Sequence, residues 1–222
     1  MFAFTNGINP TATQELPFTV HIASACQIKQ AVDLRAERYS WHQPEVGALL
    51  QVPEPEDHEP GCEVFIVSSK LDGQTLATLR AHTNALKPLP LEASIALPAD
   101  YAGQRLVEVT RLAVAAGAGS VARDALFKAL FIRCQQLGVA RFVITSRHPV
   151  DRMYQKMGFR DVFGNCVYHM MSHVDGMPLR VMTLPIDHAF SQLPVGLHSF
   201  MFHTRHPDIL IDHGTALWAT SI

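Results

Sequence analysis

The chain has 222 residues, of which 48% are apolar and 17% charged, so it can bury a sizeable core and is not a disordered chain. Lys and Arg number 18 against 20 Asp and Glu, which leaves no basic excess for binding nucleic acid. No apolar run approaches the roughly 20 residues of a membrane helix. The N-terminus also lacks the basic start and apolar core of a signal peptide. These features predict a soluble, cytoplasmic protein without an integral membrane segment.

The first half of the chain predicts a strand, a helix and a hairpin. Residues 1–17 are polar and are expected to form a loose N-terminal arm. Ser24 is the expected N-cap of the helix, since serine side chains cap helix N-termini. Leu71-Asp72-Gly73 is typical of a tight hairpin turn. The predicted elements are a strand over 18–23, a helix over 24–41, a Pro/Glu-rich loop over 52–61, and strands over 62–70 and 74–82.

The second half predicts a strand, a glycine turn and a helix after a long connection. Three prolines between residues 85 and 100 indicate an irregular segment. Gly117 and Gly119 end the next strand, and Ser120 is the predicted N-cap of the following helix. The predicted elements are strands over 104–115, 139–146, 166–174 and 179–186, helices over 121–137 and 148–158, and a short helix in the tail after residue 189.

This order of elements predicts one α/β domain over residues 18–188, with residues 189–222 as a C-terminal appendage packed on it. A hairpin makes antiparallel neighbours and a strand–helix–strand unit makes parallel ones, so the sheet is expected to be mixed. Helices are expected on both of its faces.

The cysteines and histidines give no sign of a disulfide framework or a metal site. Cys26, Cys62, Cys134 and Cys166 are scattered, and their spacing predicts free thiols in a reducing compartment. The 12 histidines include several in the tail, but no HExxH motif or cysteine partner accompanies them. No metal ligand is therefore predicted.

The glycine turn before residue 121 is a candidate anion site. Gly117 and Gly119 stand directly before a predicted helix, where backbone N–H groups point out of the helix end. Such a helix start suits a pyrophosphate or the phosphate of a phosphopantetheine arm. A glycine turn is also an ordinary loop, and this alternative stays open on the turn alone.

An acidic residue, Glu108, interrupts the apolar strand that precedes this turn. A carboxylate in the middle of a packed sheet is costly unless it is paired or close to solvent. Glu108 is therefore expected either to pair with an arginine such as Arg80 or to border a cleft. Strict alternation would place Glu108 and Arg111 on opposite faces of the sheet, and a β-bulge between them would change that. A purely structural ion pair is the alternative.

Three local signals resemble the GCN5-related N-acyltransferase (GNAT) superfamily over roughly residues 18–175. They are the strand–glycine turn–helix unit, the Asp-Gly hairpin, and YQKMGF at 154–159, which matches the family's Tyr-x-x-x-Gly-Phe. The family's loop is Gln/Arg-x-x-Gly-x-Gly/Ala, and Val114 stands here in place of Gln or Arg. The resemblance implies a mixed, mostly antiparallel sheet. It also implies that Val114, Gly117, Gly119 and Ser120 hold the phosphate arm of an acyl thioester.

A second set of residues resembles one branch of that superfamily. Glu108-Val-Thr-Arg111 is similar to the Glu-x-Ser/Thr-Arg segment of the N-acyl-homoserine lactone synthases and the long-chain N-acyl amino acid synthases. Arg80 matches the branch's arginine on the preceding strand, and Arg35 with Tyr39 matches its Arg-aromatic pair on the first helix. The further Trp and Asp residues of the lactone synthases are not placed here, which favours the amino acid synthases.

The resemblance implies an N-acyltransferase with assigned roles. Glu108 would accept the proton of the attacking amine, and Tyr154 would protonate the departing thiolate unless its ring only packs under its helix. Arg35, Arg80 and Arg111 would bind the carboxylate of an amino acid acceptor, because guanidinium pairs with carboxylate through two hydrogen bonds. A backbone N–H near residues 112–114 would stabilise the thioester oxygen.

The expected donor is an acyl group carried on the phosphopantetheine of acyl carrier protein, with acyl-CoA as the alternative; no cofactor is expected to be bound permanently. Because carrier proteins are acidic, a basic patch is expected on the helix that carries Arg123, Lys128 and Arg133. Two other readings stay open. One is an ordinary acetyl-CoA-dependent N-acetyltransferase. The other is a catalytically inactive relative that binds an acylated metabolite.

Overall fold

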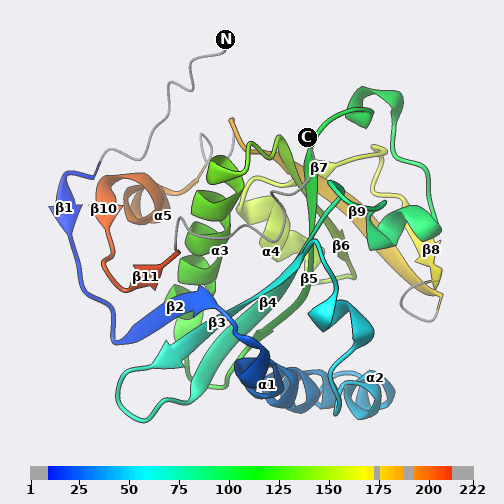
Figure 1. The fold of residues 1–222 in the computed structure, drawn as a ribbon. Helices are drawn as coiled ribbons and strands as arrows, with labels where there is room; N and C mark the ends of the chain where they lie inside the picture. The colour runs from blue at the N-terminus through cyan, green and yellow to red at the C-terminus, as the bar shows by residue number, and fades with distance from the viewer. Residues whose placement is uncertain (1–9, 173–175, 188–192, 212–222) are drawn as a thin grey trace.

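The computed structural model describes residues 10–172, 176–187 and 193–211. It contains a nine-stranded central sheet in the order β11-β2-β3-β4-β5-β6-β9-β7, with β8 paired to β9 (Figure 1). The strands of this sheet are β2 (Phe18–Ile22), β3 (Cys62–Ser69), β4 (Thr75–Thr83), β5 (Leu106–Val114), β6 (Arg141–Ser146), β7 (Arg160–Asp161), β8 (Tyr168–Met171), β9 (Met177–Pro185) and β11 (Ile209–Leu210).

The helices follow the predicted order with two differences. They are α1 (Ile28–Ser40), α2 (Pro44–Leu49), α3 (Gly119–Gln136), α4 (Asp151–Lys156) and α5 (Val195–His198). The short helix α2 is missing from the sequence prediction, because the prolines and glycine of this stretch resemble a loop. The predicted cap at Ser120 is wrong, since α3 begins at Gly119 after Ala118 and places Ser120 inside its first turn.

The sheet is mostly antiparallel, as the sequence predicted. Strands β2, β3, β4 and β5 pair antiparallel in succession, and β6 pairs antiparallel with β9. The pairing of β5 with β6 is parallel, because α3 carries the chain back between them. A second parallel pair, β11 with β2, lies at the edge of the sheet, whereas β5 and β6 lie in its middle and position the site described below.

Helix α3 covers one face of the sheet and α1 covers the other. On β3, Phe65 and Val67 belong to the large apolar core with α3 and α4, whereas Val64 and Ile66 pack against α1. This separation follows from the alternation of side chains along a strand. A third cluster lies on the α1 face, where Leu91 of the irregular 85–100 segment packs near β5 and β6.

The N-terminal arm is not loose where the structure describes it. The short strand β1 (Ala12–Thr13) pairs in parallel with β10 (Thr204–Arg205). Beyond it, the Leu16 N–H donates to Asp208 Oδ2 at 2.6 Å. The two ends of the chain therefore hold each other, a pairing that no local sequence pattern indicates.

The cysteines and the tail add further detail to the described residues. All four cysteines are free. Within the described residues, no helix is both long and apolar enough to cross a membrane. In the same residues, no group of three or more His, Cys, Asp or Glu side chains is placed to hold a metal ion. The helix predicted in the tail is present as α5, which continues into a π-helical turn over Ser199–His203.

Candidate active site

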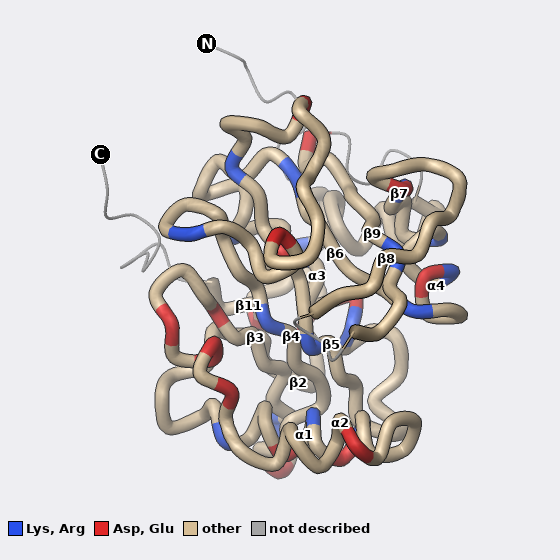
Figure 2. Tube along the Cα trace, turned by 90° about the vertical axis from the view of Figure 1, so that its right-hand side faces the viewer, with Lys and Arg blue, Asp and Glu red and all other residues tan. Residues whose placement is uncertain are grey.

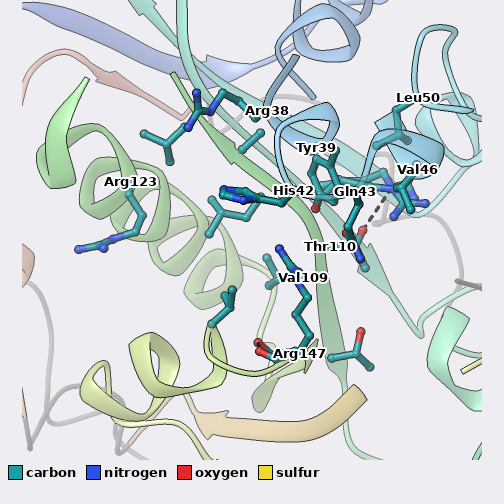
Figure 3. Close-up of a pocket in the computed structure, with 18 of the residues that line it drawn as sticks. Arg38, Tyr39, His42, Gln43, Val46, Leu50, Val109, Thr110, Arg123 and Arg147 are labelled. Atoms are coloured by element: carbon teal, nitrogen blue, oxygen red, sulfur yellow. Dashed lines mark hydrogen bonds between the residues drawn. The ribbon is translucent and has the colours of Figure 1, made fainter. Parts of the chain in front are cut away.

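A cavity of about 860 Å³ lies where β5 and β6 separate. The parallel pairing of these strands starts at Leu106 with Arg141 and ends at Val109 with Ile144. Past that point, the remainder of β5, the end of β6 and the first turns of α3 and α4 line the cavity together with α1, α2 and β9. The cavity is therefore bordered by helices from both faces of the sheet (Figure 3).

A β-bulge shapes the β5 wall of this cavity. On β4 one residue separates Thr78 from Arg80, but on β5 two residues separate their partners, Ala113 and Thr110. Arg111 is the first of these two residues and has a φ of 54°. Left-handed backbone is uncommon for arginine and, where it occurs, often marks a functional site. The bulge lets Arg111 reach the same carboxylate as Arg80.

The glycine turn lies at the edge of the cavity. Val114, Gly117, Gly119 and Ser120 all line it, as does the segment of β5 before them. Gly117 and Gly119 have φ values of 80° and 70°, which glycine adopts far more readily than other residues. A Cβ on either glycine would meet nothing within 4 Å, so the conformation and not crowding requires glycine here. The N-terminus of α3 thus opens towards the cavity.

Tyr154 on α4 also lines the cavity, although most of its ring is packed. It is 6% exposed and makes edge-to-face contacts with Phe127 at 6.3 Å and Phe159 at 5.4 Å between ring centroids. Burial raises the pKa of its hydroxyl, so the phenol is protonated at neutral pH. Both interpretations made from the sequence fit this placement: the ring packs under the helix and still borders the cavity.

Arg35, Arg80 and Arg111 come together, but two internal carboxylates hold them. Arg35 Nη1 donates to Asp57 Oδ1 at 2.6 Å, and Arg80 Nη1 lies 3.3 Å from the same oxygen. Arg80 Nη1 also donates to Glu54 Oε2 at 3.1 Å, and Arg111 donates to both oxygens of Glu54. Arg35 is 1% exposed and lies outside the cavity lining, so contact between Arg35 and a substrate does not fit this structure.

Glu54 and Asp57 are site residues that sequence reasoning missed. Both come from the Pro/Glu-rich loop, whose 3-10 turn spans Pro55–His58. Burial alone would raise the pKa of the Asp57 carboxyl, but Arg35 and Arg80 hold it below its usual value. In the same way Arg111 and Arg80 lower the pKa of Glu54 against the effect of burial. Both carboxylates are thus ionised at neutral pH and fix the arginines in place.

Glu108 lies on the α1 face but behind the cavity wall. It is fully buried, and its Oε2 accepts a hydrogen bond of 2.9 Å from the Leu91 N–H. The two residues that follow it, Val109 and Thr110, line the cavity, as does Pro90 beside Leu91. Burial raises the pKa of the carboxyl to about 8. Its role as a base stays a prediction, and in this conformation the segment around Leu91 covers it.

The cross-strand neighbour of Glu108 is another buried titratable residue. His82 on β4 pairs with Glu108 on β5 and is 2% exposed. Burial lowers the pKa of its imidazole to about 3, so the ring is neutral. The sheet therefore carries an uncharged imidazole and a predominantly protonated carboxyl side by side, two residues along β4 from Arg80 of the arginine cluster.

Three cavity residues were not singled out from the sequence. Arg38 on α1, His42 in the α1–α2 turn and Arg147 after β6 all line the cavity. Figure 3 shows Arg147 extending into it from the side of α4 and His42 entering it from the α1–α2 side. The sequence could have indicated the first two. Arg38 follows Arg35 by three residues and His42 follows Arg38 by four, a spacing that places side chains on one side of a helix and its first continuing turn. Arg147 has no comparable signal.

Helix α3 does not present the basic patch expected for a carrier protein. Lys128 is 2% exposed, and its Nζ donates to two carbonyl oxygens of the C-terminal segment, one of them Phe200 O at 2.6 Å. Arg133 is 4% exposed and donates to Glu63 Oε1 at 2.6 Å. Of the predicted three, Arg123 lines the cavity. Basic and acidic residues are interspersed over the molecule, and basic segments of β4 and β5 lie near its centre (Figure 2).

Comparison with known proteins agrees with this geometry. A search of curated protein sequences finds no significant match. The structure of FeeM, an N-acyl amino acid synthase from uncultured soil microbes, superposes with a TM-score of 0.59 at 15% identity over 81% of this chain and 95% of that one. BjaI, a CoA-dependent acyl-homoserine lactone synthase solved with SAM and isopentyl-CoA, gives a TM-score of 0.57 at 12% identity over 85% and 93%.

A more distant likeness extends to the acetyltransferases. An acetyltransferase of the GNAT family from Staphylococcus aureus gives a TM-score of 0.51 at 9% identity and covers 76% of this chain and 99% of its own. These likenesses show the shared fold. The family model described as N-acyl amino acid synthase FeeM matches residues 30–185, which is more than half of the sequence. The chain belongs to the FeeM family of N-acyl amino acid synthases and is an N-acyltransferase.

Proposed function

We propose that this enzyme transfers a medium or long acyl chain from a thioester to the amine of an amino acid. The observation that carries the proposal is the opening between β5 and β6 beside the glycine turn of α3. A phosphate at the N-terminus of α3 would place the pantetheine arm along the splayed part of β5. The thioester carbon would then lie in the cavity near Tyr154.

The cavity supports an acyl chain longer than acetyl. Its volume of about 860 Å³ falls in the range of roughly 300–1,000 Å³ that is usual for sites that enclose a drug-sized ligand. Apolar residues of α2 and β9 form part of its wall, namely Val46, Leu49, Leu50, Met177 and Leu179. An acetyl group would leave this wall uncovered, whereas a fatty acyl chain would bury it and gain about 25 cal/mol per Å² of apolar surface. This favours a fatty acyl donor over the acetyl-CoA alternative.

The donor carrier is either acyl carrier protein or coenzyme A. Both present the same phosphopantetheine arm, so the glycine turn with Val114, Gly117, Gly119 and Ser120 serves either one. The sequence favoured the carrier protein because it predicted a basic patch on α3 for an acidic partner. Lys128 and Arg133 are buried, so α3 does not present that patch. BjaI, which shares the fold, is CoA-dependent. Both donors fit the glycine turn, and an assay with each of them distinguishes the two.

The chemistry uses groups that line the opening. The pairing of β5 with β6 ends at Val109, so the backbone N–H groups of β5 that face β6 beyond it have no partner on that strand. One of them would stabilise the oxygen of the tetrahedral intermediate. Tyr154, protonated at neutral pH, would donate a proton to the leaving thiolate. Arg80 and Arg111, fixed by Glu54, would form the polar wall of the acceptor side. Glu108 would act as proton acceptor only after the Leu91 segment moves away from it.

Direct assay of the purified enzyme tests this function. The enzyme is incubated with acyl-CoA and acyl-carrier-protein donors from acetyl to palmitoyl and with each of the common amino acids. Mass spectrometry then identifies the products, and a thiol reagent measures release of the carrier thiol. We expect an N-acyl amino acid and one thiol per amide. Exclusive use of acetyl-CoA would replace this function by ordinary acetylation, and no thioester consumption with any amine would overturn it.

A further inference from the structure

Arg147 differs from the other arginines that line the cavity. Within the described residues, each of the others has a carboxylate nearby: Arg80 and Arg111 at Glu54, Arg123 at Asp124, and Arg38 at 3.9 Å from Glu37. No carboxylate lies within ion-pairing distance of Arg147 in the part of the chain that the structure describes. A cation that borders a cavity without an internal partner is available to bind an anionic ligand.

The backbone around Arg147 is well fixed, so its side chain starts from a defined place. It follows Ser146, which is 4% exposed at the end of β6. The Arg147 carbonyl accepts a hydrogen bond of 3.0 Å from the Asp151 N–H, which ties it to the first turn of α4. From there the side chain extends into the cavity, whose lining also includes His42 (Figure 3).

His42 reaches the same space from the opposite side. Its backbone N–H donates to Tyr39 O at 3.0 Å, and the next residue, Gln43, donates to the same oxygen at 2.7 Å. The Gln43 side chain also contacts Met177 Sδ at 3.3 Å, which links the α1–α2 turn to β9. These contacts hold the turn against the cavity while the imidazole stays open to solvent. Histidine is the side chain that most often acts as general base in enzymes.

The two sides of the cavity suit the two substrates. The glycine turn and Tyr154 belong to α3 and α4 on one face of the sheet, where the donor is proposed to lie. His42 belongs to the α1–α2 side and faces the opening from the direction left for the acceptor. Glu108, which the sequence nominated as base, is fully buried under the Leu91 segment. A base that needs no rearrangement must come from the cavity lining.

We propose that Arg147 binds the carboxylate of the acceptor amino acid and that His42 accepts the proton from its ammonium group. This inference rests on the proposed function. His42 takes one proton, and the free amine attacks the thioester carbon. The C–N bond forms and the C–S bond breaks, Tyr154 protonates the leaving sulfur, and the second amine proton restores the Tyr154 hydroxyl, so the products are an amide and a thiol. His42 then releases its proton to solvent, and one proton appears per turnover.

The first experiment tests the pairing of Arg147 with the acceptor carboxylate by removing each of the two charges in turn. Arg147→Met is compared with wild type on the preferred amino acid and on the corresponding amino acid amide, which lacks the carboxylate charge. We expect kcat/KM for the amino acid to fall about 100-fold and that for the amide to change less than about threefold, since a lost charge-assisted pair affects only the charged substrate. Arg152→Met, an exposed arginine on α4 outside the cavity lining, is the matched control. Equal losses on both acceptors would overturn the assignment.

The second experiment tests His42 by chemical rescue. His42→Gly should lower kcat/KM about 100- to 1,000-fold, the usual contribution of a general base, and added imidazole should restore part of the rate. A positioning role would give no rescue. His42→Gln, which keeps the bulk of the side chain, serves as the second variant if glycine disturbs the turn. His203→Gly, at an exposed histidine outside the cavity lining, is the control. Wild-type rates in both His42 variants, or a loss that imidazole does not restore, would overturn the role.

A binding measurement separates this inference from the proposed function. Calorimetry with an N-acyl amino acid and with its carboxamide needs no turnover. We expect wild type to bind the acid more tightly than the amide, and Arg147→Met to bind both alike. If wild type consumes no thioester yet shows this preference, the proposed function fails and the Arg147 site stands. If wild type is active but Arg147→Met keeps the preference, the Arg147 site fails and the function stands.

Discussion

The two faces of the central sheet are built from different kinds of residues. The α3 face is mainly apolar, with Phe65, Leu79 and Leu126 fully buried in one continuous core, and the charges that it buries include the pair of Arg133 with Glu63 and, separately, Lys128. The α1 face buries a connected group of charges, among them Arg35 and Asp57. The same strands contribute to both faces, since neighbouring residues along a strand point in opposite directions. The difference must therefore come from what packs on each face.

The comparison separates stability from reactivity. Burial of apolar side chains on the α3 face is the main favourable contribution to folding. Buried ion pairs on the α1 face contribute little net stability, because desolvation offsets their attraction, but removing one partner leaves an uncompensated charge. The charged face therefore acts as a scaffold that holds Arg80 and Arg111 beside the cavity. Four predictions test this division, from the largest expected effect to the smallest.

Removing Asp57 should have the largest effect. Asp57→Ala leaves Arg35 and Arg80 buried without their shared carboxylate, and we expect the free energy of unfolding to fall by about 3–5 kcal/mol. The double variant Arg35→Met/Asp57→Leu removes both charges and should recover much of that loss. Urea unfolding of the two variants and of Asp33→Ala, an exposed carboxylate on α1, provides the comparison. A double variant as unstable as the single one would contradict the scaffold role.

Truncating the apolar face should lower stability without changing the site. Leu126→Ala on α3 removes a fully buried side chain and should cost about 2–5 kcal/mol, because the surrounding core fills the cavity only partly. At a temperature where the variant is folded, kcat/KM should match that of wild type. Val121→Ala, on the exposed side of the same helix, should change neither quantity. A selective loss of activity in Leu126→Ala would show that the two faces are not independent.

The buried carboxyl on the α1 face should make stability depend on pH. Burial raises the pKa of Glu108 from 4.5 to about 8, so the folded state holds a proton that the unfolded state has released. This contribution is full below pH 4.5 and is lost as pH rises through 8. Below pH 6.5 the lowered pKa of His82 opposes it, because there the unfolded state binds the extra proton.

The net effect of Glu108 should therefore show between pH 6.5 and 8. We expect the free energy of unfolding to carry a falling component of up to about 1.4 kcal/mol per pH unit in that window. Glu108→Gln stays neutral at every pH and should remove this component. Denaturant unfolding of both proteins at several pH values measures it. Identical pH profiles would mean that Glu108 titrates near its ordinary value and is less enclosed than its position indicates.

The smallest effect is expected at the start of α3. The sequence predicted Ser120 as a helix cap, whose loss usually costs about 1 kcal/mol. The structure places Ser120 inside the first turn with no capping hydrogen bond. Ser120→Ala should therefore change the free energy of unfolding by less than about 0.5 kcal/mol, as for most surface substitutions. Thermal unfolding checks this, and a loss near 1 kcal/mol would restore the predicted cap.

Much of the fold followed from local pattern. The hairpin turn at Asp72-Gly73, the strand before Gly117 and the long apolar helix after it all lie within one or two residues of their predicted places. The spacing of apolar residues and the positions of glycine indicate backbone conformation, and that conformation depends mainly on residues close by in the chain. Helix α2 and the pairing of β1 with β10 did not follow. The first has loop-like composition, and the second joins residues 192 positions apart.

The site was predictable in kind but not in arrangement. The sequence identified Arg80, Arg111 and Glu108 as unusual, because charged residues in apolar strands need partners. It could not show that Glu54 binds both arginines, since Glu54 lies 26 residues from Arg80 and 57 from Arg111. It also could not show that Leu91 covers Glu108. Such partners meet only after distant segments pack.

The sequence by itself determined the order of elements, the glycine turn and the family, because these depend on residue types at fixed spacing. Only the tertiary structure decided which cations are already neutralised and which still face the cavity. From the sequence, Lys128 and Arg133 were expected on the exposed side of a helix. In the structure both are buried, where Lys128 donates to the Phe200 carbonyl and Arg133 donates to Glu63. The availability of a charge depends on every residue that surrounds it in space, and this neighbourhood exists only in the folded chain.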